Sequence, residues 1–462
     1  MWSLAVLPLE NLSCDQLEEY FADGMTEALI NNLAQIRALR VISRTSVMRF
    51  KGSHKSLPEI AQELNVDAVI TGSVRRDGAR VKITAQLIRA TTDAHMWARD
   101  YDRKMADILN LQSEVAGAIV DEIRIEITAE ERARLAAARR VKPEAYEAYQ
   151  LGRYHNRKMN EDDLREAIER YERAIQIDPG YAAAWAGLSD AWLERGIRGA
   201  KTFHEAETPS REAALEAVEL DTNLAEAHVA LSRIKFHFET DWSGAEQEAK
   251  RALRLDPGSR DAHFAYANLL MALGRHDEAI RHMQNAAQLD PLSSETQSIL
   301  GRALYRAGKY AEAELRLKRA IELDPRDYGA YGRLGDLYEQ MRRYPEVITS
   351  LEKAEALRNG GKGVGYRSRL ARAYAAMGRR GEARRMLEEI KATTEPDRLP
   401  LLAMAAAYTA LGDKDEAFKL LFRAIDERNT NITYVKEAPP LKNLHSDPRW
   451  KEALRRMNFP EE

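Results

Sequence analysis

Four arginines occur at the same place in a repeated helical pattern, and their type suggests recognition of carboxylates. Arg153, Arg233, Arg302 and Arg372 each follow the small residue at which two paired helices are expected to cross. The planar guanidinium group can donate two parallel hydrogen bonds to one carboxylate. We therefore predict that these four side chains act together on acidic groups of a protein or peptide.

Further side chains with binding chemistry are expected on the same helical face. The equivalent positions in other units carry Asp190, Asn268, Asp336 and Ala406, so the charge along this face is not uniform. Arginine and aromatic residues are enriched among those that dominate binding at protein interfaces. The predicted partner-binding residues are Arg153, Arg157, Arg233, Phe236, His237, Asn268, Arg302, Tyr305, Arg306 and Arg372. The alternative is that they form ordinary solvated helix faces in a chain rich in charge.

A regular spacing of aspartates indicates the elements that would position these side chains. Asp221, Asp256, Asp290 and Asp324 are 35, 34 and 34 residues apart, and Asp178 and the last three are each followed by proline. A 34-residue period of paired helices resembles that of tetratricopeptide repeats (TPRs). Solenoids of this kind present a concave surface to other macromolecules and need no catalytic residues to do so.

About eight repeats are expected over residues 143–428, and residues 429–462 depart from the period. The departing segment is predicted to cap the solenoid, with a final helix over 447–457. The small and apolar positions of each repeat are expected to fill the space between helices. Because the four arginines lie outside that apolar pattern, we expect them to be exposed and replaceable by glutamate without unfolding the array.

The first quarter of the chain has a different pattern. Strands are predicted at residues 3–9, 39–43, 66–74 and 80–88, with a short one around His95–Ala98. Helices are predicted at residues 17–36, 58–64 and 105–127. The Asp77-Gly78 pair between two of the strands is typical of a tight hairpin turn. This order predicts a small α/β domain over residues 1–128, joined to the repeats by a helical linker over 129–142.

Several motifs in this region resemble one bacterial module. They are Ala5-Val-Leu-Pro-Leu-Glu-Asn-Leu-Ser13, Tyr20-Phe-Ala-Asp-Gly-Met-Thr-Glu27, Leu39-Arg-Val-Ile-Ser-Arg-Thr-Ser46, Gly72-Ser-Val-Arg-Arg76 and the stretch from Thr84-Ala-Gln-Leu-Ile88 to Trp97. The region is similar to the TolB amino-terminal-like domain, which precedes TPR arrays in many multidomain regulators. In such relatives the module commonly follows a nucleotide cyclase, a Ser/Thr kinase or a winged-helix transcription domain. No such domain is readable in this chain, and the resemblance leaves open whether one precedes Met1.

Composition favours a scaffold in a reducing compartment. The 462 residues carry 70 Lys and Arg against 73 Asp and Glu, a net charge of −3, which disfavours attraction of the whole molecule to nucleic acid or anionic membranes. Cys14 is the only cysteine, so an intrachain disulfide and a cysteine metal cluster are excluded. The sequence has no apolar run of about 18 residues and no signal-peptide pattern. We therefore expect a cytoplasmic protein.

Three further signals favour ordinary structure over chemistry. Residues 359–365 are rich in glycine, but they follow a helix and lack the P-loop order, so a joint between repeats is expected. His276 and His282 are six residues apart, which is not the spacing of two metal ligands on one helical face. Glutamates interleave the basic run from Arg132 to Lys142, which favours an exposed linker helix over a nucleic-acid site.

These observations predict a non-enzymatic scaffold without cofactor or metal, which binds a protein or peptide in its concave groove. The scaffold is expected to serve a bacterial signalling or regulatory system and to bind no nucleic acid itself. The alternative is the effector half of a multidomain regulator whose catalytic or DNA-binding domain lies outside this chain. Self-association of the chain stays open.

Overall fold

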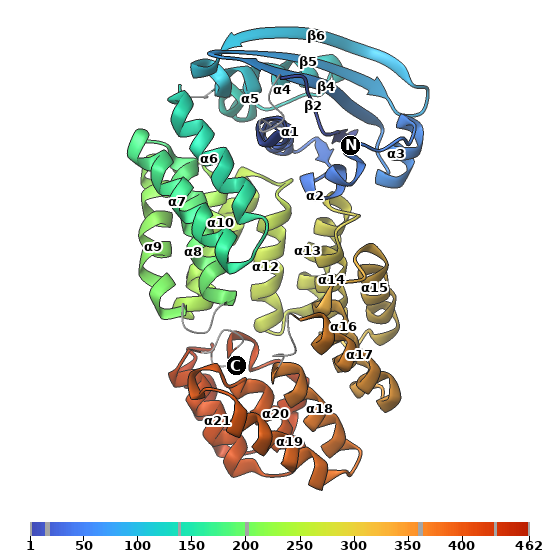
Figure 1. Ribbon diagram of the computed structural model, residues 1–462, viewed down its shortest axis with the longest axis vertical. Coiled ribbons are helices and arrows are strands. Elements are labelled where there is room, and N and C mark those ends of the chain that lie inside the picture. Colours follow the sequence, from blue (N-terminus) through green and yellow to red (C-terminus); the bar gives the residue numbers. More distant parts are fainter. Residues whose placement is uncertain are drawn as a thin grey trace.

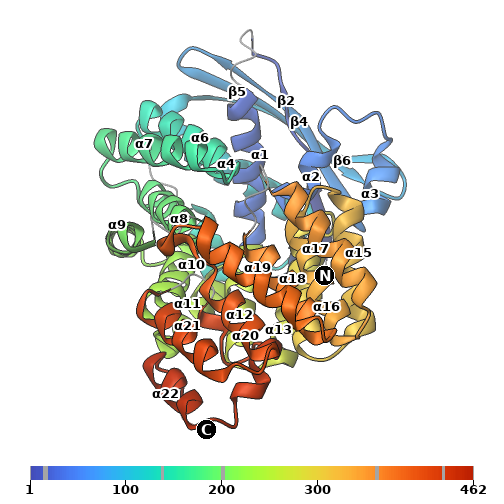
Figure 2. The ribbon, with the colours of Figure 1, turned by 60° about the horizontal axis from the view of Figure 1, so that its bottom comes forward.

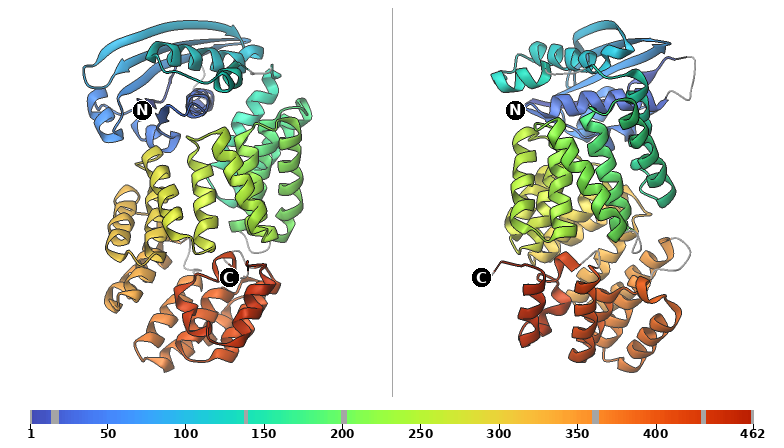
Figure 3. Two further views of the ribbon diagram at one scale, coloured as in Figure 1. Left: turned by 180° about the vertical axis from the view of Figure 1, so that it is seen from behind. Right: turned by 90° about the vertical axis from the view of Figure 1, so that its left-hand side faces the viewer.

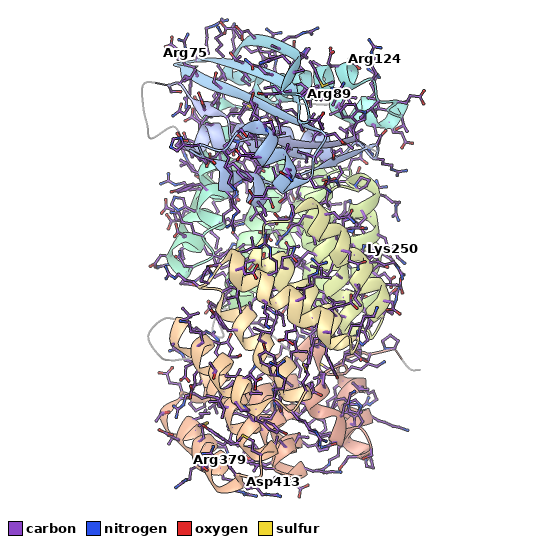
Figure 4. All side chains as sticks on the ribbon, turned by 90° about the vertical axis from the view of Figure 1, so that its right-hand side faces the viewer. Arg75, Arg89, Arg124, Lys250, Arg379 and Asp413 are labelled. Carbon is purple, nitrogen blue, oxygen red and sulfur yellow. The ribbon has the colours of Figure 1, made fainter. Side chains whose placement is uncertain are left out.

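The fold combines a small α/β domain with a long all-α solenoid of TPRs, as the sequence predicts (Figure 1). The computed structural model describes residues 2–13, 19–136, 140–198, 203–358, 364–428 and 432–460. Cys14, Arg139 and residues 359–363 of the glycine-rich joint expected at 359–365 lie outside these described residues. The α/β domain and the last repeats lie at opposite ends of an elongated molecule: Figure 4 shows Arg75 and Arg89 of the sheet at one end and Arg379 and Asp413 at the other.

The sheet of the α/β domain is mixed. Its strand order is β3 (Leu39–Val41), β1 (Trp2–Val6), β4 (Ala68–Asp77), β5 (Arg80–Arg89) and β6 (Ala94–Lys104), and β2 (Glu10–Asn11) also pairs with β4. β1 runs parallel to β3 and β4, whereas β4, β5 and β6 are antiparallel to one another. On β5 the alternating Val81, Ile83 and Leu87 are buried, as expected for a strand with one covered face.

The edge strand β6 is longer than predicted. The sequence suggested a short strand around His95–Ala98, but pairing with β5 continues to Lys104 over 11 residues. Only Trp97 and Tyr101 of β6 are buried, because one edge and one face of the strand are exposed. Charged residues on such an edge hinder pairing with other chains, and their abundance concealed the strand in the sequence.

Five helices complete the domain. They are α1 (Glu19–Ala34), α2 (Arg44–Val47), α3 (Leu57–Leu64), α4 (Ile108–Ile123) and α5 (Ala129–Ala136). α1 and α4 pack against each other and against the sheet (Figures 1 and 3). α4 ends earlier than the predicted residue 127, because Arg124 adopts a left-handed conformation with φ of 56°. The short helix α2 was not predicted.

Eight helix pairs are present among the described residues after the α/β domain. They are α6 (Pro143–Asn156) and α7 (Glu161–Ile177), α8 (Ala182–Arg198) and α9 (Phe203–Leu220), α10 (Ala225–Ile234) and α11 (Trp242–Leu255), α12 (Arg260–Ala272) and α13 (His276–Leu289), α14 (Ser294–Arg306) and α15 (Tyr310–Leu323), α16 (Tyr328–Gln340) and α17 (Tyr344–Leu357), α18 (Val364–Ala376) and α19 (Arg380–Thr393), and α20 (Leu401–Ala410) and α21 (Lys414–Asp426). Glycine is needed where α14 and α15 cross, because a Cβ on Gly301 would lie 2.7 Å from Leu317 Cγ.

The turns between repeats are closed by a side chain at one recurring position. In four consecutive repeats a side-chain N–H donates a hydrogen bond to the backbone oxygen six residues earlier. The bonds are Trp185 to Pro179 (2.9 Å), His228 to Thr222 (3.1 Å), His263 to Pro257 (3.3 Å) and Gln297 to Pro291 (3.4 Å). The histidines at equivalent repeat positions therefore have a structural role in the turn.

The α/β domain rests on the solenoid through α2. Ser43 N donates to Leu289 O (2.7 Å), and Ser46 Oγ donates to Asp290 Oδ1 (2.6 Å). Arg49 donates to Leu292 O (3.2 Å). Asp290 is one of the periodic aspartates, so the domain is held at a turn between repeats.

The carboxy-terminal segment folds back on repeats that lie about two hundred residues earlier (Figure 2). It contains the short helices η8 (Ile432–Tyr434) and η9 (Pro439–Leu444) and the final helix α22 (Pro448–Arg456). Trp242 Nε1 donates to Met457 O (3.0 Å), and the Trp242 and Phe459 rings stack with centroids 4.4 Å apart. α22 also packs on α21, so the segment covers the last repeat and contacts the third.

Candidate peptide-binding surface

The ten predicted partner-binding residues lie on the first helices of their repeats or at the ends of these helices. Arg153 lies in α6 and Arg157 follows it, Arg233 lies in α10, Phe236 and His237 lie in a π-helical turn (Lys235–Glu239) that extends α10, Asn268 lies in α12, Arg302, Tyr305 and Arg306 lie in α14, and Arg372 lies in α18. We call these ten residues, with Asp190, Glu194, Arg333, Asp336 and Glu339, the inner surface. First helices of neighbouring repeats contact one another from α6 to α12 and from α14 to α20, and a hydrogen bond from Arg302 to Asn268 joins α14 to α12.

Carboxylates of the α/β domain neutralise the amino-terminal end of the inner surface. Arg153 and Arg157 both form ion pairs with Glu27 of α1. Arg44 lies 3.5 Å from Glu27 and 3.1 Å from Asp23. Burial lowers the pKa of Arg157 to about 10. These arginines hold the α/β domain against the first repeat and are covered by it.

Arg233 is neutralised within the solenoid. It forms ion pairs with Asp190 and Glu194 of α8, and Asn156 Nδ2 donates to Asp190 Oδ2 (2.9 Å). Burial acts against ionisation of Glu194, but the cations Arg233 and Arg198 lower its pKa to about 2. Arg233 therefore lies in a closed network of opposite charges.

The two aromatic candidates beside Arg233 are enclosed. Phe236 is 2% exposed, and its ring contacts Trp242 and Tyr434. Burial and the nearby Arg233 lower the pKa of His237 to about 3, and its Nδ1 is buried without a hydrogen-bond partner. In this structure Phe236 belongs to the contact with the carboxy-terminal segment.

Three arginines of the inner surface differ from its other four, because none of the carboxylates described lies within ion-pair distance of them. They are Arg302, Arg306 and Arg333. We call these three residues the central arginine cluster. Arg302 donates to Asn268 Oδ1, and Arg333 donates to Ser298 Oγ (2.9 Å). Burial lowers the pKa of Arg333, and the charge of Arg302 acts in the same direction. Glu437 and Asp327 act on Arg306 and Arg333 from a greater distance, so the described residues leave the cluster without a direct ion pair.

The carboxy-terminal segment lies over this cluster. The guanidinium carbons of Arg302 and Arg306 lie 4.9 and 5.1 Å from the centre of the Tyr434 ring. Arg306 donates to the backbone oxygen of Glu437 (2.9 Å), while the Glu437 carboxylate lies 3.2 Å from His276. The Nε atoms of Arg302 and Arg306 are buried without an acceptor. Burial, together with Arg302, lowers the pKa of Arg306 to about 10.

Arg372 contradicts the expectation that all four repeat arginines are exposed. It is 5% exposed and lies 2.8 Å from Asp336 and 2.6 Å from Glu339. Although burial opposes it, these carboxylates raise the pKa of Arg372. Tyr305 is half-buried nearby, and burial raises its pKa. Replacing Arg372 by glutamate would place a third carboxylate in this cluster, so the array is not expected to tolerate the change.

Sequence reasoning missed the residues that distinguish these environments. Glu27, Tyr434 and Glu437 come from outside the repeats, so the repeat period gives no sign of them. Arg333 lies three places before Asp336, which is the position that was compared between repeats. Glu194 follows Asp190 by one helical turn, a spacing that could have identified the pair for Arg233.

Family models match both the amino-terminal and the carboxy-terminal part of the chain. Tetratricopeptide repeat models match residues 156–197, 239–303, 273–331, 304–360 and 365–395, so the carboxy-terminal part contains TPRs. Residues 1–117 match the model of the HilA/YgeH-like transcriptional regulator, second domain. This match does not support the TolB-like resemblance, which stays a prediction.

One curated relative is the Rhizobium meliloti (strain 1021) protein named "Putative adenylate cyclase 3". It is 42% identical over 187 residues, which are 40% of this chain and 32% of the relative. The matched region thus spans about a third of the relative's length.

Solved structures with similar folds include TPR proteins of low sequence identity. The Cut9–Hcn1 structure of the APC/C is 16% identical with a TM-score of 0.42, and covers 72% of this chain and 62% of its own. The thermophilic TPR protein TTC0263 of Thermus thermophilus is 19% identical with a TM-score of 0.35, and the match covers 44% of this chain and 99% of that protein. YrrB, described as a TPR protein with an unusual peptide-binding site, is 19% identical with a TM-score of 0.30, and the match covers 41% of this chain and 93% of YrrB.

The described residues also bear on membrane-spanning and metal-binding roles. No helix in the described ranges is long and apolar enough to cross a membrane. Within the same ranges, no group of three or more His, Cys, Asp or Glu side chains could hold a metal ion.

Proposed function

We propose that this chain is a non-enzymatic interaction scaffold that binds a protein or peptide on its inner surface. TPR arrays are generally scaffolds of this kind, and the first helices from α6 to α18 contribute polar side chains to the inner surface. The observation that carries the proposal is the central arginine cluster, where three cations lack the carboxylates that neutralise the others. A partner could supply that charge.

The remaining expectations belong to this proposal. The chain would comprise a TolB-like module over 1–128, a linker over 129–142, about eight repeats over 143–428 and a cap over 429–462. It would act in the bacterial cytoplasm and bind no nucleic acid.

Capture of a partner from bacterial lysate tests the scaffold role. The whole chain serves as bait beside an inner-surface variant, Arg302→Glu with Arg306→Glu, and a matched variant, Arg281→Glu with Arg319→Glu. Arg281 and Arg319 are exposed on the second helices α13 and α15, so the matched variant makes the same charge change elsewhere. We expect a partner that the wild type and matched variant retain and the inner-surface variant loses. Absence of any partner for the wild type would contradict the scaffold role.

The alternative is that the chain is the effector part of a larger regulator. The match to a transcriptional-regulator domain and the relative named as an adenylate cyclase both favour a regulatory context. The scaffold proposal predicts no cyclic AMP when the purified chain is incubated with ATP and Mg²⁺. Turnover above the level of a heat-denatured sample would contradict the non-enzymatic assignment.

A further inference from the structure

The carboxy-terminal segment links the end of the array directly to its middle. Trp242 of α11 donates to Met457 O (3.0 Å), and its ring stacks on Phe459. Arg428, which follows α21, forms an ion pair with Glu207 of α9 (3.0 Å). Figures 1 and 3 show the carboxy terminus between the middle and the last repeats. The eighth repeat and the segment after it therefore contact the second and third repeats, and the array closes on itself.

The same segment covers part of the inner surface. The Tyr434 ring lies against Phe236 and faces the guanidinium groups of Arg302 and Arg306. Glu437 O accepts a hydrogen bond from Arg306 (2.9 Å), and η8 packs on α12. The segment thus covers α10, α12 and α14 and leaves Phe236 only 2% exposed. A partner could reach Phe236 only after the segment had moved.

Hydrogen bonding at this contact is incomplete. Twelve buried side-chain polar atoms of the described residues have no hydrogen-bond partner, and four of them lie at the contact. They are His276 Nδ1, Arg302 Nε, Arg306 Nε and Thr433 Oγ1. Buried polar groups in native proteins are nearly always paired, because an unpaired group is not compensated for the water it has lost. These four atoms regain water when the segment detaches, so they favour the open state.

Apolar contacts act in the opposite direction and hold the segment in place. Ile432 and Val435 are 3% and 0% exposed, and the rings of Trp242 and Phe459 stack with centroids 4.4 Å apart. Removal of this apolar surface from water stabilises the docked state. The free energy of docking is the difference between the apolar gain and the polar cost. Segments held by such a difference open locally at a lower free energy than the whole fold.

We propose that the carboxy-terminal segment, residues 432–460, is a reversible latch. It detaches from the second to fifth repeats while the array stays folded, and in the closed state it shields the inner surface at α10, α12 and α14. The latch is therefore an autoinhibitory element of this chain. Shielding has a consequence only if the inner surface binds a partner, so the autoinhibition rests on the proposed scaffold function, whereas the opening itself does not.

The reactivity of a buried thiol measures the opening of the latch. In a Cys14→Ser background, Val435→Cys places a thiol in the latch, and Val347→Cys places one in α17 of the sixth repeat as a matched control. Both valines are 0% exposed. A buried thiol reacts only while it is exposed, so we expect N-ethylmaleimide to modify position 435 of the whole chain at least about tenfold faster than position 347 under native conditions. Equal rates would show that only unfolding of the array releases the segment, and would overturn the latch.

Two variants shift the latch in opposite directions. Phe459→Ala removes the stack on Trp242 and should speed labelling at position 435 about tenfold, with no change at position 347. Thr433→Val replaces the unpaired hydroxyl by a methyl group of similar size and should slow labelling at position 435 about fivefold. An equal increase at both positions in Phe459→Ala, or unchanged or faster labelling in Thr433→Val, would overturn the proposal.

Partner capture separates the latch from the scaffold role. Phe459→Ala should retain at least about fivefold more of a lysate partner than the wild type does, because more of its molecules are open. Equal amounts would overturn the autoinhibition. A partner captured by the wild type, together with equal labelling at positions 435 and 347, would leave the scaffold role and remove the latch. Absence of any partner, together with faster labelling at position 435, would contradict the scaffold role and leave the latch intact.

Discussion

The two ends of the inner surface and its centre use the same residue type in different ways. At the ends, Arg153, Arg157, Arg233 and Arg372 face carboxylates of Glu27, Asp190, Glu194, Asp336 and Glu339. In the centre, Arg302 and Arg306 face neutral groups and the ring of Tyr434. Position within a repeat therefore places an arginine on this surface, but the neighbouring elements decide whether its charge is already neutralised.

Removal of the Arg372 charge should have the largest effect. Arg372→Gln leaves the carboxylates of Asp336 and Glu339 in a buried position with one fewer cation, so the free energy of unfolding should fall by about 3–5 kcal/mol. Urea denaturation followed by circular dichroism measures the change. The control is Arg369→Gln: among the described residues the ion pair of Arg369 is with Asp336 (3.3 Å), which keeps Arg372, so a loss of about 1 kcal/mol is expected. Equal losses of stability in the two variants would mean that the deeper burial of Arg372 does not determine the size of the effect.

Loss of the ring above the central arginines should have the next largest effect. Tyr434→Ala removes contacts with Phe236, Arg302 and Arg306 and opens a cavity, so we expect a loss of about 2–3 kcal/mol in the same denaturation assay. Tyr434→Phe keeps the ring and should cost less than about 1 kcal/mol. A full loss in the Phe variant would point to the hydroxyl group rather than to the ring.

A fall in pH should lower the free energy of unfolding through His237, which lies in the π-helical turn after α10. Burial and Arg233 lower its pKa to about 3, so the folded chain binds this proton less readily than the unfolded chain. Stability from the neutral imidazole is therefore present above the unfolded pKa of about 6.5 and is lost as the pH falls below it. We expect about 2 kcal/mol less stability at pH 5 than at pH 7 from this residue, because the unfolded chain is largely protonated at His237 at pH 5 whereas the folded chain is not. His237→Gln should remove that part of the pH dependence, and an unchanged pH profile would contradict it.

Removal of a central charge should have the smallest effect on stability. Arg302→Gln loses a hydrogen bond and a ring contact but also relieves repulsion with Arg306 and Arg333, so the net change should stay within about 1 kcal/mol. Comparison with Arg372→Gln in the same assay tests the contrast directly. A loss as large as that of Arg372→Gln would show that an unrecognised partner neutralises Arg302.

Regular features were predictable because they depend on residues close in sequence. The aspartate spacing, the crossing glycines and the Asp77-Gly78 turn predicted the helix pairs and the hairpin, and family models confirm the TPRs. The edge strand β6 was underestimated, because an exposed strand needs few apolar residues. The helix α2 is only four residues long, too short for a periodic signal.

The candidate site could be predicted only in part. The sequence placed ten residues on one surface, and their place on or beside the first helices follows from the repeat geometry. It could not show that Phe236 lies beneath Tyr434, or that Glu27 reaches Arg153, because these pairs are separated by 198 and 126 residues. Contacts of this kind depend on how the α/β domain and the carboxy-terminal segment dock on the curved array.

The amino-acid sequence by itself determined the solenoid, the order of the α/β domain and the face on which the arginines lie. Helical period and small residues at crossings are local properties, and they repeat along the chain. Only the tertiary structure decided which arginines are neutralised, since ion pairing requires charges within a few ångströms of each other. The docked domain supplies Glu27 at one end, and the returning segment covers Arg302 and Arg306 with a neutral ring rather than a carboxylate.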